Sequence, residues 1–216
     1  ARVLFTSSGS VYGRRAASLA SADGGGVAET DWGVLDAMDT ATAYAISGQA
    51  KRAAEQWCAA YHREHGLNVV VARCFTFLGP GMPLAGKFAA GNFLADALGG
   101  RDIVIRGDGT AVRSYLYASD LAIWLWRLLL EGPAGRAFNV GAEEAVSLRE
   151  LAEIVREEVA PQVAVRVLGE KGPSGVADVY VPRTAKAREE LGLRATVSLR
   201  EAVRRTADWL GCSRPR

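Results

Sequence analysis

The feature that most constrains the fold is a short stretch near the N-terminus, residues 3–13, which reads VLFTSSGSVYG. Its first three residues are apolar and predict a buried strand. A hydroxyl-rich turn at residues 6–10 follows the end of that strand. Ligands of open α/β sheets bind at the carboxyl ends of the strands, and hydroxyl groups there can hydrogen-bond a substrate hydroxyl or carbonyl. We therefore expect a ligand site at this turn.

The second informative segment is a helix predicted over residues 44–64. It is rich in alanine, glutamine, lysine, arginine and glutamate, which are strong helix formers. It carries Tyr44 and Lys51. A phenol whose pKa is lowered by a nearby ammonium group can act as a general acid or base. The turn and the helix together indicate acid–base chemistry at the end of the first strand.

Composition argues against several other classes of protein. The 216 residues are 49% hydrophobic and carry a net charge of +2, which gives no electrostatic reason to expect nucleic acid or a membrane surface as partner. No apolar stretch reaches the roughly 20 residues of a membrane span. Cys58, Cys74 and Cys212 lack a metal-like spacing and favour reduced thiols in a cytoplasmic protein. With only His62 and His65 besides, we expect no metal site.

The remainder of the chain alternates predicted strands with predicted helices. Strands are expected at residues 67–72, 102–106, 137–140 and 163–168, and helices at 87–98, 121–130, 184–191 and 198–210. Ser119 or Asp120 is expected to cap the helix that begins at residue 121. Ser147 and Ser198 are each followed three residues later by glutamate, which predicts two capping boxes. Residues 14–39 and 170–177 are predicted loops.

Six motifs occur in an order that resembles one known family. They are TSSGSVYG, KRAAE, ARCFTFLGPG, GNFLADAL, GDGTAVRSYLYASDLA and FNVG. The sequence resembles the extended short-chain dehydrogenase/reductase family, specifically its nucleoside-diphosphate-sugar epimerases and dehydratases. The resemblance implies an α/β fold with a Rossmann-like, doubly wound parallel sheet and a smaller C-terminal α/β substrate lobe. Residues 1–75, joined by 118–140, would belong to the dinucleotide-binding domain, and residues 76–216 mainly to the substrate lobe.

The family begins with βαβ units that carry a GxxGxxG phosphate-binding turn. That turn has no match in these 216 residues, so we expect the chain to be the C-terminal two thirds of a longer enzyme. Its first strand would then need neighbours on both sides. The implied cofactor is NAD. NADP stays open as the alternative, because the residue that reads the ribose lies in the absent units.

The resemblance implies a 4-epimerase, which inverts a sugar at C4 through a transient 4-keto intermediate. Ser8, with Ser10 nearby, would hydrogen-bond the C4 oxygen, and Tyr44 would take the hydroxyl proton. Lys51 would lower the pKa of Tyr44 and bind the nicotinamide ribose.

Further contacts are implied by the resemblance alone. The cofactor would also meet Ser7 and Phe75, in addition to Tyr44 and Lys51. The nucleoside-diphosphate sugar would also meet Thr76, Asn92, Arg106 and Arg113. Arg113 would pair with the diphosphate, which suits the bidentate geometry of a guanidinium. The family further implies a homodimer.

The spacing of Tyr44 and Lys51 departs from the family, in which the lysine follows the tyrosine by four residues. Here it follows by seven, and Ser47 stands four residues before Lys51. A regular helix would separate Tyr44 from Lys51 by about 10.5 Å along its axis, instead of about 6 Å. Either three residues have been inserted between Tyr44 and Lys51, or Ser47 has replaced the tyrosine; the preceding DTATAY matches the family and favours Tyr44. A bulge or an unwound first turn near Gly48 would restore contact between Tyr44 and Lys51, and without it catalysis would be impaired.

Alternative functions follow from the same residues. Dehydratases need acidic residues where Gly9 and Ser10 stand, and decarboxylases commonly carry glutamate in place of Ser10, so both reactions are disfavoured. A 4-ketoreductase needs only the serine, tyrosine and lysine. A catalytically inactive sugar-nucleotide-binding homologue is the alternative from another class, since the phosphate turn is absent and the tyrosine–lysine spacing is altered.

Overall fold

The computed structural model describes residues 1–13, 26–32, 38, 43–86, 88–170 and 178–212. The predicted loops at 14–39 and 170–177 therefore lie mostly outside the described residues. The elements of the first half are β1 (Arg2–Ser8), the short 3-10 helix η1 (Gly9–Tyr12), α2 (Ala43–His65), β2 (Asn68–Cys74), β3 (Phe77–Leu78), α3 (Ala89–Leu98), β4 (Ile103–Ile105) and β5 (Val112–Arg113). Those of the second half are β6 (Leu116–Tyr117), α4 (Ala118–Glu131), β7 (Arg136–Val140), β8 (Val146–Ser147), α5 (Leu148–Val159), β9 (Val165–Val167), β10 (Val179–Tyr180), α6 (Ala185–Leu191) and α7 (Leu199–Cys212).

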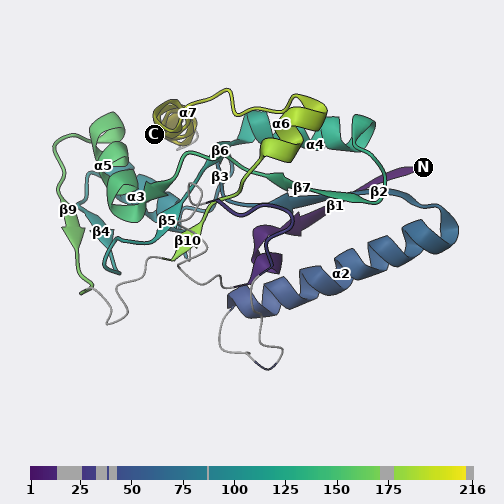
Figure 1. The fold of residues 1–216 in the computed structure, drawn as a ribbon. Helices are drawn as coiled ribbons and strands as arrows, with labels where there is room; N and C mark the ends of the chain where they lie inside the picture. Colours follow the sequence, from purple (N-terminus) through teal and green to yellow (C-terminus); the bar gives the residue numbers. More distant parts are fainter. Residues whose placement is uncertain (14–25, 33–37, 39–42, 87, 171–177, 213–216) are drawn as a thin grey trace.

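A parallel sheet in the order β1-β2-β7 forms the larger part of the molecule. Helix α2 covers one face of this sheet, and α4 and α6 cover the other (Figure 1). The core on the α4 side contains the fully buried Ala72, Trp124 and Phe138. The sequence prediction of a parallel α/β sheet with helices on both faces is confirmed, because strands rich in valine and alanine need covering on both sides.

Strand β1 differs from its prediction in length and in burial. It extends to Ser8, so Ser7 and Ser8 lie in the strand rather than in a turn, opposite Arg73 and Cys74 of β2. Val3, predicted to be buried, is 38% exposed. Among the described strands β1 pairs only with β2, so one edge of β1 has no strand beside it and its side chains are less covered than those of β2.

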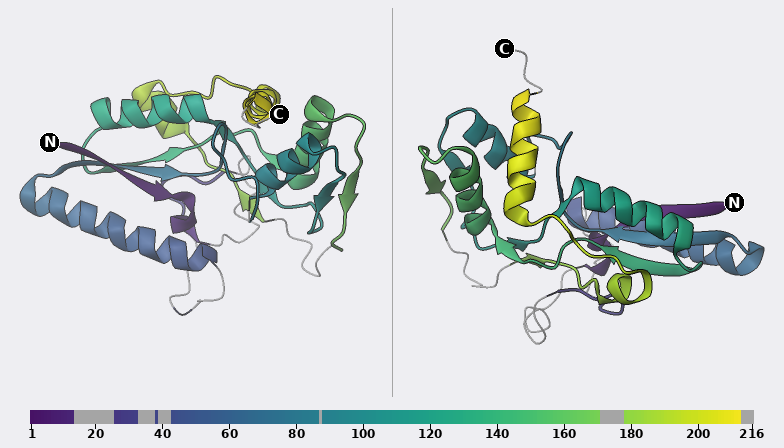
Figure 2. Two further views of the ribbon diagram at one scale, coloured as in Figure 1. Left: turned by 180° about the vertical axis from the view of Figure 1, so that it is seen from behind. Right: turned by 90° about the horizontal axis from the view of Figure 1, so that it is seen from above.

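A second group of elements lies to one side of the sheet and contains α3, α5 and α7 (Figure 2). Two small sheets accompany these helices, in the orders β4-β9 and β10-β5-β8. Their apolar side chains form a separate core that includes Leu94, Ile103, Leu151 and Val203, all fully buried. This group has the mixed α/β character expected of the smaller lobe, and the predicted bounds of the two lobes stay a prediction.

The predicted helix caps are partly confirmed. Ser147 and Glu150 form the expected capping box at the start of α5, and Ser198 Oγ accepts the N–H of Glu201 at 3.3 Å. The cap predicted for α4 is wrong, because that helix already begins at Ala118. Asp120 instead lies buried in the first turn and accepts two hydrogen bonds from Thr196, which ties α4 to the segment before α7.

In the part of the chain that the structure describes, no helix combines the length and the apolar character needed to cross a lipid bilayer.

Candidate functional site

A cavity of about 760 Å³ opens where the carboxyl end of the parallel sheet meets the second lobe. Ser8, Ser10 and Ser47 line it from the sheet and α2. Arg113 and Tyr180 line it from the two strands of the second lobe that pair with each other. The remaining wall is mainly apolar and includes Leu78, Met82, Pro83, Phe88 and Leu148. A largely apolar cavity with a few convergent polar groups is the usual form of a small-molecule site.

Four hydroxyl groups gather on one wall of the cavity, and we refer to Ser8, Ser10, Ser47 and Tyr180 as the hydroxyl cluster. Ser10 Oγ donates to Ser8 Oγ at 2.9 Å, and the N–H of Ser10 donates to the same oxygen at 3.1 Å. Ser47 Oγ lies 3.4 Å from Ser10 Oγ, and Tyr180 Oη lies 3.5 Å from Ser8 Oγ. The predicted Ser8–Ser10 pair thus exists and has two further hydroxyl neighbours.

Helix α2 is continuous from Ala43 to His65, so the bulge considered near Gly48 does not form. Its regular geometry brings Ser47, four residues before Lys51, against Ser10. Lys51 Nζ donates to the carbonyl of Thr6 at 2.8 Å and therefore lies beside the end of β1. Tyr44 is in the first turn of the helix, but its side chain lies outside the described residues, and its catalytic role stays a prediction.

Tyr180 can approach the hydroxyl cluster because residue 9 is a glycine. A Cβ atom at Gly9 would lie 2.7 Å from Tyr180 Oη and 2.8 Å from the ring of Phe75, which is too close for either. The Phe75 and Tyr180 rings pack with their centroids 4.7 Å apart. Burial raises the pKa of Tyr180, and the hydrogen bond with Ser8 only partly opposes this, so the phenol stays protonated and able to donate.

Besides Ser8, two of the predicted substrate residues line the cavity. Thr76 is one of them and follows Phe75, which also lines the cavity. Arg113 Nη2 pairs with Asp178 Oδ2 at 2.7 Å, and its Nη1 donates to the Asp178 carbonyl, also at 2.7 Å. The Asp178 side chain is 75% exposed, so this ion pair is open to solvent.

The other two predicted substrate residues lie outside the described cavity lining. Asn92 Nδ2 donates to the carbonyl of Gly86 at 2.9 Å and fixes the chain before α3. Arg106 is exposed just after β4. Their roles were carried over from the resemblance alone and stay predictions.

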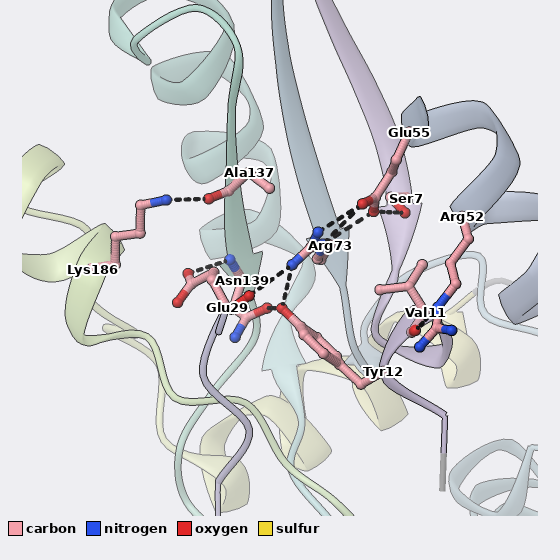
Figure 3. Close-up of polar contacts among 10 residues, drawn as sticks. All are labelled: Ser7, Val11, Tyr12, Glu29, Arg52, Glu55, Arg73, Ala137, Asn139 and Lys186. Carbon is pink, nitrogen blue, oxygen red and sulfur yellow. Dashed lines mark hydrogen bonds and ion pairs between the residues drawn. The ribbon is translucent and has the colours of Figure 1, made fainter. Parts of the chain in front are cut away.

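A second polar cluster lies on the α2 side of the same strand ends and is buried (Figure 3). We refer to Ser7, Tyr12, Glu55, Arg73 and Asn139 as the ionic cluster. Arg73 Nη2 pairs with Glu55 Oε2 at 2.7 Å, and Ser7 Oγ donates to Glu55 Oε1 at 2.5 Å. Arg73 Nη1 donates to Tyr12 Oη at 2.9 Å, and Tyr12 Oη donates to Asn139 Oδ1 at 2.7 Å.

Strand register accounts for this cluster. Ser7, Arg73 and Asn139 are direct neighbours across β1, β2 and β7, so their side chains share one face of the sheet. Burial alone would lower the pKa of Arg73, but the hydrogen bond and charge of Glu55 outweigh it and raise that pKa. The cluster is thus held in its charged form. Ser7, predicted to contact the cofactor, directs its hydroxyl to Glu55 instead of into the cavity.

The comparisons with known proteins agree with this architecture. The model of the NAD dependent epimerase/dehydratase family matches residues 1–141. The chain belongs to this family. Among curated relatives, UDP-glucuronic acid decarboxylase 6 from Arabidopsis thaliana is 33% identical over 203 residues, which are 94% of this chain and 55% of that protein. UDP-glucuronic acid decarboxylase 1 from Xenopus tropicalis is 28% identical over 206 residues, which are 95% of this chain and 46% of that protein.

Solved structures of this family share the fold. UDP-glucose 4-epimerase from Thermotoga maritima has a TM-score of 0.80 and 23% identity. The match includes 96% of this chain and 62% of the epimerase chain. A dTDP-glucose 4,6-dehydratase from Streptomyces venezuelae, solved with NAD bound, has a TM-score of 0.77 and 26% identity. The match includes 98% of this chain and 60% of the dehydratase chain. The chain spans about half the length of the curated relatives it matches.

Proposed function

We propose that the protein containing this chain is an NAD-dependent nucleoside-diphosphate-sugar 4-epimerase, which inverts the sugar through a transient 4-keto intermediate. The observation that carries the proposal is the hydroxyl cluster at the carboxyl end of β1, with Ser8 and Ser10 facing the cavity. Hydroxyl groups can both donate to and accept from a sugar oxygen, so they suit a group that alternates between alcohol and ketone.

Arg113 supports the diphosphate part of the proposal. Arg113 lines the cavity, and its guanidinium already holds a carboxylate, Asp178, in a charge-assisted pair. A diphosphate offers the same oxygen geometry with more charge. Because Asp178 is mostly exposed, its release to solvent costs little, and we expect the substrate diphosphate to displace it from Arg113.

The residues at the end of β1 fit the nicotinamide end of the cofactor. Lys51 is half-exposed there, and an ammonium has three donors, so its bond to the Thr6 carbonyl leaves capacity for ribose hydroxyls. When bound, the nicotinamide would accept a hydride from sugar C4 and return it. The chain's own residues would hold and orient the sugar: Ser8 and Ser10 at the reacting oxygen, and Arg113 at the diphosphate.

UDP-glucuronate decarboxylation is the second candidate, because the curated relatives named above are decarboxylases. We rank it below epimerisation because Ser10 occupies the place where decarboxylases commonly carry glutamate. A 4-ketoreductase or dehydratase ranks lower still, and Gly9 offers no carboxylate for dehydration. An inactive binding homologue is supported by the altered spacing of Tyr44 and Lys51 on the unbroken helix α2.

Assembly and location belong to the same proposal. The outward side of α2 exposes Ile46, Trp57 and Tyr61, with exposed fractions of 53%, 68% and 51%. Exposed apolar patches of this kind often mark protein interfaces, and we expect a homodimer formed through α2. The free thiols of Cys58 and Cys74 are those of a reducing compartment, which favours the cytoplasm.

Calorimetric titration of NAD tests the proposal, with the 216-residue chain and the complete gene product measured side by side. We expect binding to the complete product. UDP-glucose, UDP-galactose and UDP-glucuronate are then offered separately, and the products are identified by proton NMR. Inversion at C4 supports the epimerase, and loss of carbon dioxide from UDP-glucuronate supports the decarboxylase. Absence of NAD binding to both proteins would rule out the redox mechanism.

A further inference from the structure

The cavity wall beside Arg113 contains a buried phenol, Tyr115, which has no role in the mechanism described so far. Tyr115 follows Arg113 by two residues in the segment that joins β5 to β6, and both residues line the cavity. Only 6% of Tyr115 is exposed. It belongs to the apolar core of the second lobe, together with Leu94 and Leu151. Tyr115 is therefore held in place by packing, and only a small part of it meets open space.

The hydroxyl group of Tyr115 is left without a protein partner. Within the part of the chain that the structure describes, it neither donates nor accepts a hydrogen bond. Among the described residues, the side-chain oxygens that are both fully enclosed and unpaired are Asn68 Oδ1 and Ser114 Oγ. Tyr115 Oη therefore keeps some accessible surface, and the space that Tyr115 lines is the cavity. Because buried polar groups are normally hydrogen-bonded, this hydroxyl points to a ligand in the cavity as its partner.

The phenol of Tyr115 is a hydrogen-bond donor at neutral pH. Burial raises the pKa of Tyr115 to about 12, and the positive charge of Arg113 opposes this only in part. A protonated phenol has one proton to donate. Hydrogen bonds to an ionised acceptor are stronger than those between neutral groups, so the phenol favours an anionic oxygen as its acceptor.

Arg113 supplies the charge that brings an anionic oxygen to this wall. It is the one charged residue among the described residues that line the cavity. Its Nη1 donates to the backbone carbonyls of Val112 and Asp178, at 2.8 and 2.7 Å, which fixes the direction of the guanidinium. Its charge also acts on Tyr115, so the two side chains lie near each other. An anion that pairs with Arg113 from the cavity therefore comes close to the phenol.

We propose that Tyr115 is a further substrate-binding residue, whose hydroxyl donates a hydrogen bond to the diphosphate that pairs with Arg113. The inference rests on the proposed function, in which the ligand is a nucleoside-diphosphate sugar. Arg113 contributes charge, and Tyr115 contributes a neutral donor whose direction is fixed by packing. Arg113 must release Asp178 before it pairs with the diphosphate, whereas Tyr115 has no protein partner to release.

Removal of the hydroxyl alone tests this role. Calorimetry compares the complete gene product with its Tyr115→Phe and Tyr117→Phe variants, each titrated with UDP, UDP-glucose and uridine. Tyr117 is a buried tyrosine of β6 that lies outside the described cavity lining, and it serves as the matched control. Thermal unfolding of each protein without ligand shows whether the hydroxyl stabilises the fold.

Tyr115→Phe should weaken the binding of UDP and UDP-glucose about 10–100-fold, the value of a hydrogen bond to a charged group. The affinity for uridine, which has no phosphate, should not change. The unfolding midpoint should not fall, because the variant removes a hydroxyl that has no protein partner. In turnover the loss should raise KM and leave kcat within about twofold. Tyr117→Phe should bind all three ligands like the unaltered protein.

An affinity of Tyr115→Phe for UDP equal to that of the control would overturn the assignment, and a lowered unfolding midpoint in that case would make the hydroxyl structural. An equal loss for uridine would also overturn it, because the contact would then be to the nucleoside. If UDP binding depends on Tyr115 but the unaltered protein inverts no sugar, the epimerase proposal fails and the assignment of Tyr115 stands. If the unaltered protein does not bind UDP, both fail.

Discussion

The hydroxyl cluster and the ionic cluster lie at the ends of the same strands but differ in almost every physical respect. Ser7 and Ser8 are consecutive in β1, so their side chains leave the sheet on opposite faces. Ser7 joins a sealed group of charges that satisfy one another. Ser8 joins neutral hydroxyls that line an open cavity. One strand end thus contributes a buried ionic cluster on one face and lines an open cavity on the other.

Burial determines which cluster can carry which task. The side chains of Arg73 and Glu55 are only 7% and 12% exposed, and a buried charge that loses its partner is costly. The hydroxyls carry no charge, and the cavity lets water or a ligand replace a lost partner. We therefore expect substitutions in the ionic cluster to change stability and those in the hydroxyl cluster to change activity.

The largest expected effect follows from Arg73→Met, which leaves the buried Glu55 carboxylate without its partner. We expect a loss of about 3–5 kcal/mol in the free energy of unfolding, measured by urea denaturation. Arg136→Met is the matched control, because Arg136 pairs with Glu190 at the surface and should lose at most about 1 kcal/mol. Equal losses in the two variants would remove the distinction between a sealed and an open ion pair.

Tyr12→Phe should have the next largest effect. It leaves the buried Arg73 and Asn139 each short of one hydrogen bond, which costs about 1–3 kcal/mol at neutral pH. Burial raises the pKa of Tyr12, with Arg73 opposing in part, so folding favours the protonated phenol.

The same shift gives Tyr12 a signature in alkali. Its contribution to stability is complete below the ordinary tyrosine pKa of about 10 and is lost as the pH rises beyond it, by about 1.4 kcal/mol per pH unit. Burial also raises the pKa of Tyr115 to about 12. Because Tyr115 is present in both proteins, both should lose some stability as the pH rises above about 10. Tyr12→Phe should lose less than the unaltered protein between neutral pH and pH values of about 11. Parallel urea titrations of both proteins would contradict this if their losses were equal.

Gly9→Ala should have an intermediate effect, because it affects both stability and the site. The added methyl group would collide with Tyr180 and Phe75, and such overpacking costs about 1–3 kcal/mol. It should also move the Tyr180 hydroxyl away from Ser8. Thermal unfolding measures the first effect and sugar turnover the second; unchanged turnover would show that Tyr180 is dispensable. Gly107→Ala, at a glycine with open space around it, is the control.

Much of the fold could be predicted because its signals are local. Apolar runs located the strands, helix formers located α2, and Ser147 with Glu150 marked the start of α5. The burial of β1 was overestimated, because exposure depends on neighbouring strands rather than on the strand's own residues.

The site was harder to predict because its contacts join distant residues. The Ser8–Ser10 pair could be found, since it lies within one motif. Tyr180 was missed because it approaches Ser8 across 172 positions of the chain, and no local pattern in β10 reports that contact. Ser7 bonds to Glu55 across 48 positions, so its face of the strand could not be assigned from sequence. The spacing of Tyr44 and Lys51 could not show whether the helix bulges between them, and the structure shows that α2 is unbroken there.

The most direct test of this account is one pair of measurements on Ser8→Ala in the complete gene product. We expect kcat/KM for sugar-nucleotide conversion to fall about 100-fold or more, because the hydroxyl at the reacting oxygen is lost. The free energy of unfolding should change by about 1 kcal/mol or less, the value of the cap that Ser8 provides to η1. Full activity in this variant, or a stability loss as large as that of Arg73→Met, would contradict the division of tasks between the two clusters.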